Sequence, residues 1–314
     1  MDNIKTKQSR GKRLLQYIRK NRLIYLMMIP ALGCWLLFKV GPLFGMVIAF
    51  QDYSPFKGIL GSPFIRLENF MRIFKEPYML TLIRNTVLLA LYTLVFSFTV
   101  PVAFALFLNE LKNSLVKKGV QSISFLPYFI SSAVMVSILY TMVSPTTGVI
   151  NMILVKLGME PIYFMAQPGW FRPLYVILQI WQTCGYYGII YMAAIMSIDP
   201  SIYEAASVDG ASRWQKMMKI TLPGIKTTVV VMLIVAVGNI FSVDLDRILL
   251  MYNPSVYETA DVLQTYVYRL SFQSTGFPDY GYATAVNMVK SVIAFLLVIL
   301  TNKLSKKYAE TRLF

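Results

Sequence analysis

A polar insert separates two strongly apolar runs of this chain: Glu204-Ala205-Ala206-Ser207-Val208-Asp209-Gly210-Ala211-Ser212-Arg213-Trp214-Gln215-Lys216-Met217-Met218-Lys219-Ile220-Thr221-Leu222-Pro223. Asp199 is a favourable N-cap and Pro200 suits a first helical turn, so a helix is predicted to begin there. Asp209-Gly210 predicts a turn, because glycine takes a positive φ without steric cost. A second helix follows and ends at Leu222-Pro223. The stretch therefore predicts an amphipathic helical hairpin at a membrane surface, an arrangement typical of a docking element.

Composition places the rest of the chain in a membrane. Of 314 residues, 56% are hydrophobic and 14% are charged, which is typical of a polytopic membrane protein. The apolar residues are gathered into runs of about 20, the length with which a helix crosses a bilayer. We predict an all-α integral membrane protein with about six transmembrane helices. The expected spans are residues 23–50, 81–108, 121–143, 173–197, 227–243 and 283–301.

Basic residues give the expected orientation. Lys39 and Lys290 lie within spans, and 19 of the other lysines and arginines fall in 1–22, 109–120, 197–226 and 302–314. The remaining nine lie in or beside the intervening loops. The positive-inside rule therefore predicts cytoplasmic N and C termini, with the hairpin between spans four and five also cytoplasmic. Attraction to lipid headgroups accounts for the net charge of +15 without any nucleic acid.

Several chemistries are excluded by the residues present. The chain has no histidine, so we expect no histidine metal site and no other metal site. Cys34 and Cys184 fall within apolar runs, as buried small hydrophobic residues do. The one Gly-Lys pair, Gly11-Lys12, lacks the upstream glycine and the following hydroxyl of a phosphate-binding loop. The chain is therefore not expected to hydrolyse nucleotides, and any such step must come from another chain.

Polar side chains inside the later spans predict a solute path. Tyr175, Gln179, Gln182 and Tyr186 are spaced 4, 3 and 4 apart, which places them on one helix face. Amides and hydroxyls bind sugar hydroxyls, and aromatic rings stack on sugar faces, so the set suits a neutral, hydroxyl-rich solute. For any single residue, hydrogen bonding between helices is the alternative. The other candidates are Trp181, Tyr187, Asn239, Ser242, Asn287 and Ser291.

The hairpin resembles the cytoplasmic coupling loop of ABC-importer permeases, by which a permease grips its ATPase. Nine positions carry the likeness: Glu204, Ala205, Ala206, Asp209, Gly210, Ala211, Ile220, Leu222 and Pro223. Met217 departs from the pattern, because the family usually has a bulky aromatic residue there. The resemblance implies that Glu204 makes a charged contact with the ATPase, that Gly210 sets the turn, and that the three alanines allow close docking.

The segment 121–131 and the six-span layout look like the maltose-importer type of carbohydrate permease, and most like its branch for oligosaccharides or polysaccharide fragments. The resemblance implies a permease domain over 23–302, with its core at 80–301 and the coupling loop at 199–223. A basic cytoplasmic segment, 1–22, precedes this domain, and a cytoplasmic tail, 303–314, follows it.

The same resemblance implies the partners and the location of the chain. We expect a heterodimer with a second permease subunit, two ATPase subunits that bind ATP and Mg²⁺, and an extracytoplasmic solute-binding protein. No cofactor is expected on this chain itself. The complex would lie in the inner (cytoplasmic) membrane of a bacterium, where this chain crosses the lipid bilayer several times.

Two other classes of protein stay open at this point. An ion-coupled secondary transporter or channel would carry carboxylates or histidines within its spans and often an inverted repeat. The spans have no histidine and no clear mid-span acid. A membrane glycosyl-transfer enzyme is suggested by Asp244-Leu245-Asp246 alone, which has the Asp-x-Asp spacing of metal-dependent glycosyl transfer.

Overall fold

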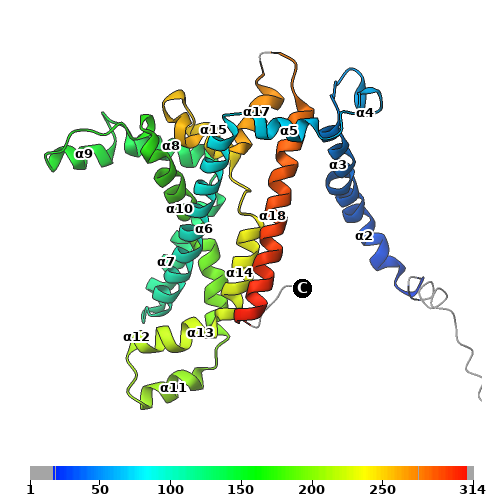
Figure 1. Ribbon diagram of the computed structural model, residues 1–314. Coiled ribbons are helices and arrows are strands. Elements are labelled where there is room, and N and C mark those ends of the chain that lie inside the picture. Colours follow the sequence, from blue (N-terminus) through cyan, green and yellow to red (C-terminus); the bar gives the residue numbers. More distant parts are fainter. Residues whose placement is uncertain (1–16, 18, 275, 310–314) are drawn as a thin grey trace, which may run out of the picture.

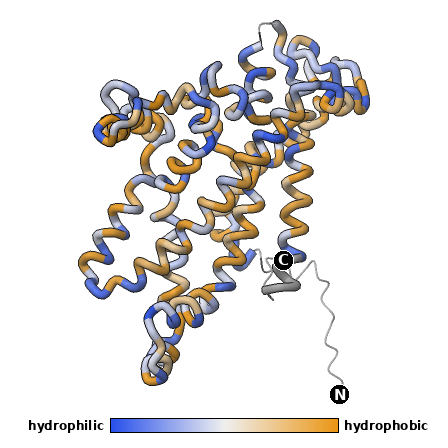
Figure 2. Tube along the Cα trace, turned by 60° about the vertical axis from the view of Figure 1, so that its left-hand side comes forward, coloured by the Kyte–Doolittle hydropathy of each residue, from blue (hydrophilic) through white to orange (hydrophobic). Residues whose placement is uncertain are grey.

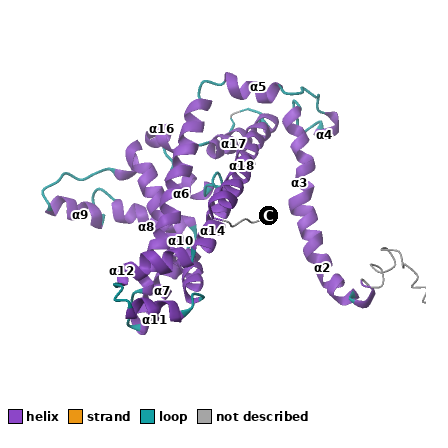
Figure 3. Cartoon of the chain, turned by 60° about the horizontal axis from the view of Figure 1, so that its bottom comes forward, coloured by secondary structure: helices purple, strands orange, loops and turns teal. Residues whose placement is uncertain are grey.

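The computed structural model describes residue 17, residues 19–274 and residues 276–309, and every regular element in them is a helix (Figure 3). The predicted all-α class is therefore confirmed for this part of the chain. Most of the basic segment 1–22 and the end of the tail 303–314 lie outside the described residues. One isolated β-bridge joins Gln51 and Phe64.

Four long helices form the body of the molecule: α6 (Met79–Asn109), α10 (Pro168–Met196), α14 (Lys226–Gly238) and α18 (Tyr280–Ala309). Helix α10 packs against α6, and α14 packs against α18. Hydrophobic residues follow these helices along most of their length, and hydrophilic residues gather at the two ends (Figure 2). The bundle thus has the apolar belt that a lipid bilayer requires.

The two ends of the bundle differ (Figure 1). One end carries the hairpin, and we call it the hairpin end. The hairpin consists of α11 (Pro200–Val208), α12 (Arg213–Lys216), η5 (Met217–Thr221) and α13 (Leu222–Gly224). Short helices cover the opposite end: α4 (Gly58–Gly61), α5 (Glu68–Lys75), α8 (Ser132–Val143), α9 (Val149–Lys156), η4 (Phe164–Ala166), α15 (Leu245–Met251), η6 (Pro254–Val256), α16 (Tyr257–Ala260) and α17 (Leu263–Phe272).

The expected third span, 121–143, is not one straight helix. Helix α7 (Ser114–Phe125) and η3 (Leu126–Phe129) meet α8 at an angle of 108°. Pro127 lies in the short 3-10 turn, and Ser131 caps α8 by accepting a hydrogen bond from the backbone N–H of Val134. The helix ends here because proline favours a turn and the cap starts a new direction.

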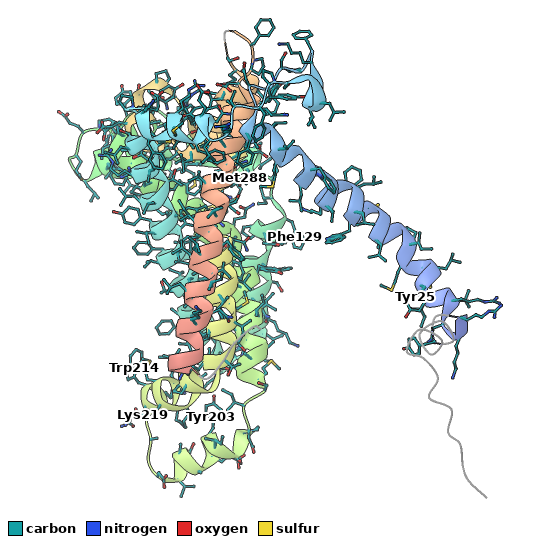
Figure 4. All side chains as sticks on the ribbon, turned by 45° about the vertical axis from the view of Figure 1, so that its right-hand side comes forward. Tyr25, Phe129, Tyr203, Trp214, Lys219 and Met288 are labelled. Atoms are coloured by element: carbon teal, nitrogen blue, oxygen red, sulfur yellow. The ribbon has the colours of Figure 1, made fainter. Side chains whose placement is uncertain are left out.

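The first expected span stands apart from the bundle. Helix α2 (Arg22–Trp35), η1 (Leu36–Val40), α3 (Gly41–Phe44) and η2 (Gly45–Phe50) follow one another as a single rod. None of the residues in its apolar stretch is buried. Tyr25, near its start, lies far from the helices of the bundle (Figure 4). Only the η2 end packs on the body of the molecule, against α18 and α5.

Length and apolar composition allow three described helices to cross a membrane, or five if each bent pair is one span. The second bent pair is 213–224 with α14, at 60°. Helix α10 has 29 residues, but it is not among these five, in keeping with the polar residues along it. The count of six spans therefore stays a prediction.

A buried carboxylate ties the opposite end together. Asp261 is 1% exposed and accepts two hydrogen bonds from Arg269, both of 2.7 Å. It also accepts hydrogen bonds from Tyr78, Tyr252 and Thr265. Burial alone would raise the pKa of Asp261, but these donors hold it below its usual value. The loop between α14 and α18 is thereby fixed to the start of α6.

A glycine sets the distance between α7 and α10. A Cβ added at Gly185 would lie 2.1 Å from the backbone oxygen of Ser124. The neighbour is backbone, which has little freedom to move aside. Any side chain at this position therefore forces the bent third segment away from α10.

Gly185→Ala is expected to destabilise the protein by about 1–3 kcal/mol, the usual cost of overpacking. The thermal midpoint and the yield of the purified protein should both fall. Gly119→Ala is the matched control on α7, because nothing lies within 4 Å of a Cβ there. Equal stability of the two variants would contradict the close approach.

Candidate functional site

A cavity of about 420 Å³ lies between α6, α10, α14 and α15. We call it the central cavity. Six of the ten predicted path residues line it: Tyr175, Gln179, Gln182, Tyr187, Asn239 and Ser242. Thr93 and Ser97 of α6 add two hydroxyls to its wall. The structure thus gathers polar side chains from three expected spans in one cavity, whose wall also contains apolar side chains.

The backbone of the cavity wall is irregular where the fifth span was expected to continue to residue 243. Helix α14 ends at Gly238, and residues 239–244 run without a helix to α15. Five of these residues line the cavity: Asn239, Ile240, Ser242, Val243 and Asp244. In a membrane-spanning segment, non-helical backbone is tolerated where it is buried in protein or lines a water-filled cavity. The early end of α14 therefore fits a solvated path better than a lipid-facing surface.

Arg247 is the centre of the polar network at this wall. Its guanidinium donates to the side-chain oxygens of Gln179 and Gln182 and lies 3.2 Å from a carboxylate oxygen of Asp244. The Arg247 side chain is 1% exposed. It also lies 5.4 Å from the centre of the Tyr175 ring, within cation–π range. One buried cation therefore joins α15 to the predicted polar face of α10.

Further hydrogen bonds fix the neighbours of Arg247. The Tyr175 hydroxyl accepts from the backbone N–H of Asp244 at 3.0 Å. The Ser132 hydroxyl of α8 donates to the Asp244 carboxylate at 2.5 Å. Gln182 donates to the backbone oxygen of Ile130 at the α7–α8 bend, at 2.8 Å. Tyr175 and Gln182 thus hydrogen-bond to other segments and also line the cavity. Both predicted roles, contact with solute and hydrogen bonding between helices, therefore fit these two residues.

Sequence reasoning missed Arg247. It counted Arg247 among the basic residues of an outer loop and considered Asp244 only as half of an Asp-x-Asp pair. The spacing of Asp244 and Arg247, three apart at a helix start, was the signal that would have found the ion pair. Asp246 is exposed and does not line the cavity, and the described residues contain no cluster of potential metal ligands.

Four predicted path residues lie elsewhere. Tyr186 stacks on Tyr128 with ring centres 4.3 Å apart, at the bend of the third segment. Trp181 is exposed, as are Asn287 and Ser291 of α18. The Ser291 hydroxyl donates to the backbone oxygen of Asn287. Their contact with solute stays a prediction.

The hairpin has the local geometry that its sequence predicts. The Asp199 carboxylate caps α11 by accepting from the backbone N–H of Ser201 at 2.9 Å. Gly210 has a φ of 74°, a left-handed conformation that suits glycine. Ser212 and Gln215 form a capping box at the start of α12, a signal that sequence reasoning did not use. The turn and both helix starts are therefore specified locally.

Two side-chain contacts hold the halves of the hairpin together. The hydroxyls of Tyr203 and Thr221 are 2.9 Å apart, and Lys216 donates to the Ser207 hydroxyl at 3.0 Å. Glu204 is exposed, as are Ala205, Asp209 and Pro223, while Ala206, Ala211, Ile220 and Leu222 are half-buried.

Apolar side chains protrude from the same hairpin. Val208 is 89% exposed and Trp214 is 60% exposed. Trp214 lies at the hairpin end with Tyr203 and Lys219 (Figure 4). Exposed apolar groups on a rigid, protruding element are typical of a protein-binding surface.

Comparison with known proteins bears directly on these features. The polygalacturonan/rhamnogalacturonan transport system permease protein YteP of Bacillus subtilis (strain 168) is 40% identical over 314 residues, which cover 100% of this chain and 97% of that protein. Protein LplB of the same organism is 36% identical over 297 residues, 95% of this chain and 92% of that protein.

A solved structure shares the fold. It is the crystal structure of a bacterial alginate ABC transporter in complex with an alginate pentasaccharide-bound periplasmic protein. One of its chains superposes with a TM-score of 0.87 at 38% sequence identity, covering 96% of this chain and 100% of that chain. The family described as binding-protein-dependent transport system inner membrane component matches residues 102–309. The chain is therefore a permease subunit, not an enzyme, and it belongs to this family of inner membrane transport components.

Proposed function

We propose that the central cavity is this chain's part of the path by which an ABC importer carries a carbohydrate across the membrane. The observation that carries the proposal is the set of polar groups in the wall of this cavity. Six buried side-chain atoms of the described residues have no hydrogen-bond partner, and three of them belong to cavity-lining residues: Thr93, Ser97 and Arg247. Unpaired buried polar groups are costly unless water or a ligand completes them. Asn239 and Ser242 of the same wall are exposed, and a hydroxyl-rich solute can bond to them.

Two comparisons support the solute class. YteP is named for polygalacturonan and rhamnogalacturonan, and the matching crystal structure is of an alginate transporter. We infer an oligosaccharide or polysaccharide fragment as the solute of this chain. The family and the ion pair of Asp244 with Arg247 both weigh against the ion-coupled transporter and the glycosyl-transfer enzyme.

The hairpin is proposed to dock on a separate ATPase subunit, which binds ATP and Mg²⁺. Its protruding position, its exposed Val208 and Trp214, and the exposed Glu204 support this role. On this proposal the motion of the ATPase reaches α10 and α14, because the hairpin lies directly between them in the chain.

The remaining partners follow from the exposed surfaces. The rod 22–50 has no buried residue in its apolar stretch, and this suits contact with lipid and with a second permease subunit. We infer a heterodimer in a bacterial inner membrane, with the hairpin in the cytoplasm and the opposite end facing a solute-binding protein. The periplasmic protein in the alginate transporter structure supports that last partner.

Thr93→Val tests the path. This change removes a hydroxyl that has no partner among the described residues. Uptake is expected to fall about fivefold, which corresponds to the loss of one hydrogen bond of about 1 kcal/mol. The yield of the complex should stay the same. The measurement is ATP-driven uptake of galactose, galacturonate and alginate oligosaccharides by the reconstituted complex with its binding protein.

Thr86→Val is the matched control on the same helix. The Thr86 hydroxyl donates to the backbone oxygen of Leu82 and accepts from the backbone N–H of Leu263, away from the cavity. It should lower the yield of the complex and leave uptake per complex unchanged. Normal uptake by Thr93→Val would remove the cavity from the path.

Gly210→Val tests the docking of the hairpin. A β-branched residue resists the φ of 74°, so the ATPase recovered with the purified chain should fall, and so should uptake. Gly158→Val is the matched control, since Gly158 has a φ of 79° in the loop after α9 and nothing lies within 4 Å of a Cβ there. Equal loss of ATPase in both variants would point to general misfolding.

Glu204→Lys should also weaken docking, because it reverses an exposed charge of the hairpin.

A further inference from the structure

The charge balance of the central cavity is set by two residues. Among the described residues that line it, only Asp244 and Arg247 are charged, and they form an ion pair of 3.2 Å. Their exposure differs: the Arg247 side chain is 1% exposed and the Asp244 side chain is 29% exposed. A solute in the cavity therefore meets the carboxylate first and the cation behind it.

The Asp244 carboxylate has one acceptor position left. One oxygen accepts from the backbone N–H of Arg247 at 3.0 Å. The other accepts from the Ser132 hydroxyl and faces the Arg247 guanidinium. A carboxylate offers about four lone-pair positions, so the described residues occupy three and leave one. The Nε of Arg247 also has no partner among the described residues, but it is buried behind this carboxylate and is closed to a solute.

A free acceptor position on a partly exposed carboxylate suits a hydroxyl. A sugar hydroxyl donates and accepts at once, whereas a uronate carboxylate only accepts. A second carboxylate beside Asp244 would also meet its negative charge in a site of reduced dielectric constant. The wall therefore fits an uncharged sugar unit better than an acidic one.

We propose that Asp244 contacts the solute by accepting a hydroxyl of an uncharged sugar unit, and that Arg247 is the positioning residue that holds Asp244 and cancels its charge. This inference rests on the proposed function of the cavity as a carbohydrate path. The polygalacturonan of YteP and the alginate of the matching structure are acidic polymers. The Asp244–Arg247 pair therefore predicts that this chain prefers uncharged sugar units, unlike the acidic polymers in those two names.

The first experiment measures the charge of the cavity without any sugar. The complex is purified through this chain lacking Cys34 and Cys184, with a single cysteine in place of Asn239. Two methanethiosulfonate reagents of similar size, one anionic and one cationic, label it, and the ratio of the anionic rate to the cationic rate is recorded. Arg247→Gln should lower this ratio about tenfold or more, as one uncompensated unit charge does at an effective dielectric constant of about 20. Asp244→Asn should raise it by a similar factor.

Three variants guard against indirect effects. Asp246→Asn makes the same charge change at an exposed residue outside the cavity and should leave the ratio unchanged. Arg247→Lys keeps the charge and should keep the ratio. The double variant Asp244→Asn with Arg247→Gln should return the ratio close to that of the parent, even if either single change lowers the yield. A ratio that stays unchanged in both Arg247→Gln and Asp244→Asn would overturn the assignment.

The second experiment measures selectivity. A galactose tetrasaccharide and the corresponding galacturonate tetrasaccharide compete for ATP-driven uptake of the carbohydrate that the complex carries. Competition by the galacturonate relative to galactose should rise in Asp244→Asn and fall in Arg247→Gln. Equal changes for both sugars would assign the pair to packing alone, and a loss confined to galacturonate in Arg247→Lys would make Arg247 a carboxylate clamp instead. If the parent complex carries no carbohydrate, the proposed function fails, while the labelling ratio still reports the charge balance.

Discussion

A guanidinium buried where the bundle meets the helices of its opposite end is the constraint on which the arrangement of these segments depends. Taking a charge out of water is expensive unless an opposite charge and hydrogen bonds replace the water. Arg247 has both, through Asp244, Gln179 and Gln182. Each partner is then fixed in turn, because Asp244 bonds to Ser132 and Gln182 to the backbone at Ile130. A single charge thereby determines how α15, α10 and the bend before α8 meet.

The same network satisfies backbone groups at the places where two expected spans are interrupted. The bend of 108° before α8 exposes backbone groups that a continuous helix would satisfy, and Gln182 bonds one of them. The segment 239–244 leaves its helix beside the cavity, and Tyr175 accepts the backbone N–H of Asp244. Polar side chains of α10 therefore replace missing helical hydrogen bonds. A face of α10 that was expected to bind solute also holds the wall in place.

The sequence predicted best what is decided locally. Caps and a left-handed glycine depend on a few adjacent residues, so Asp199 and Gly210 were identified correctly. Helical spacing also placed Tyr175, Gln179 and Gln182 together on the cavity side. Tyr186, on the same predicted face, does not line the cavity but stacks on Tyr128 near Pro127, a contact that depends on the bend. Arg247 was missed for the same reason. From the sequence alone, a basic residue after a span is assigned to a loop, and only the fold shows that it bonds to α10.

The N-terminal rod exposes apolar surface but does not by itself require a protein partner. The apolar stretch of the rod has no buried residue. In a protein core, by contrast, other side chains cover the apolar side chains. Lipid covers such a surface at no cost in hydrophobic energy, so burial alone does not require a partner. The cavity wall is different, because the unpaired atoms of Thr93, Ser97 and Arg247 need polar partners that lipid does not supply. The demand for water, solute or a second polar surface therefore arises at the cavity and not at the rod.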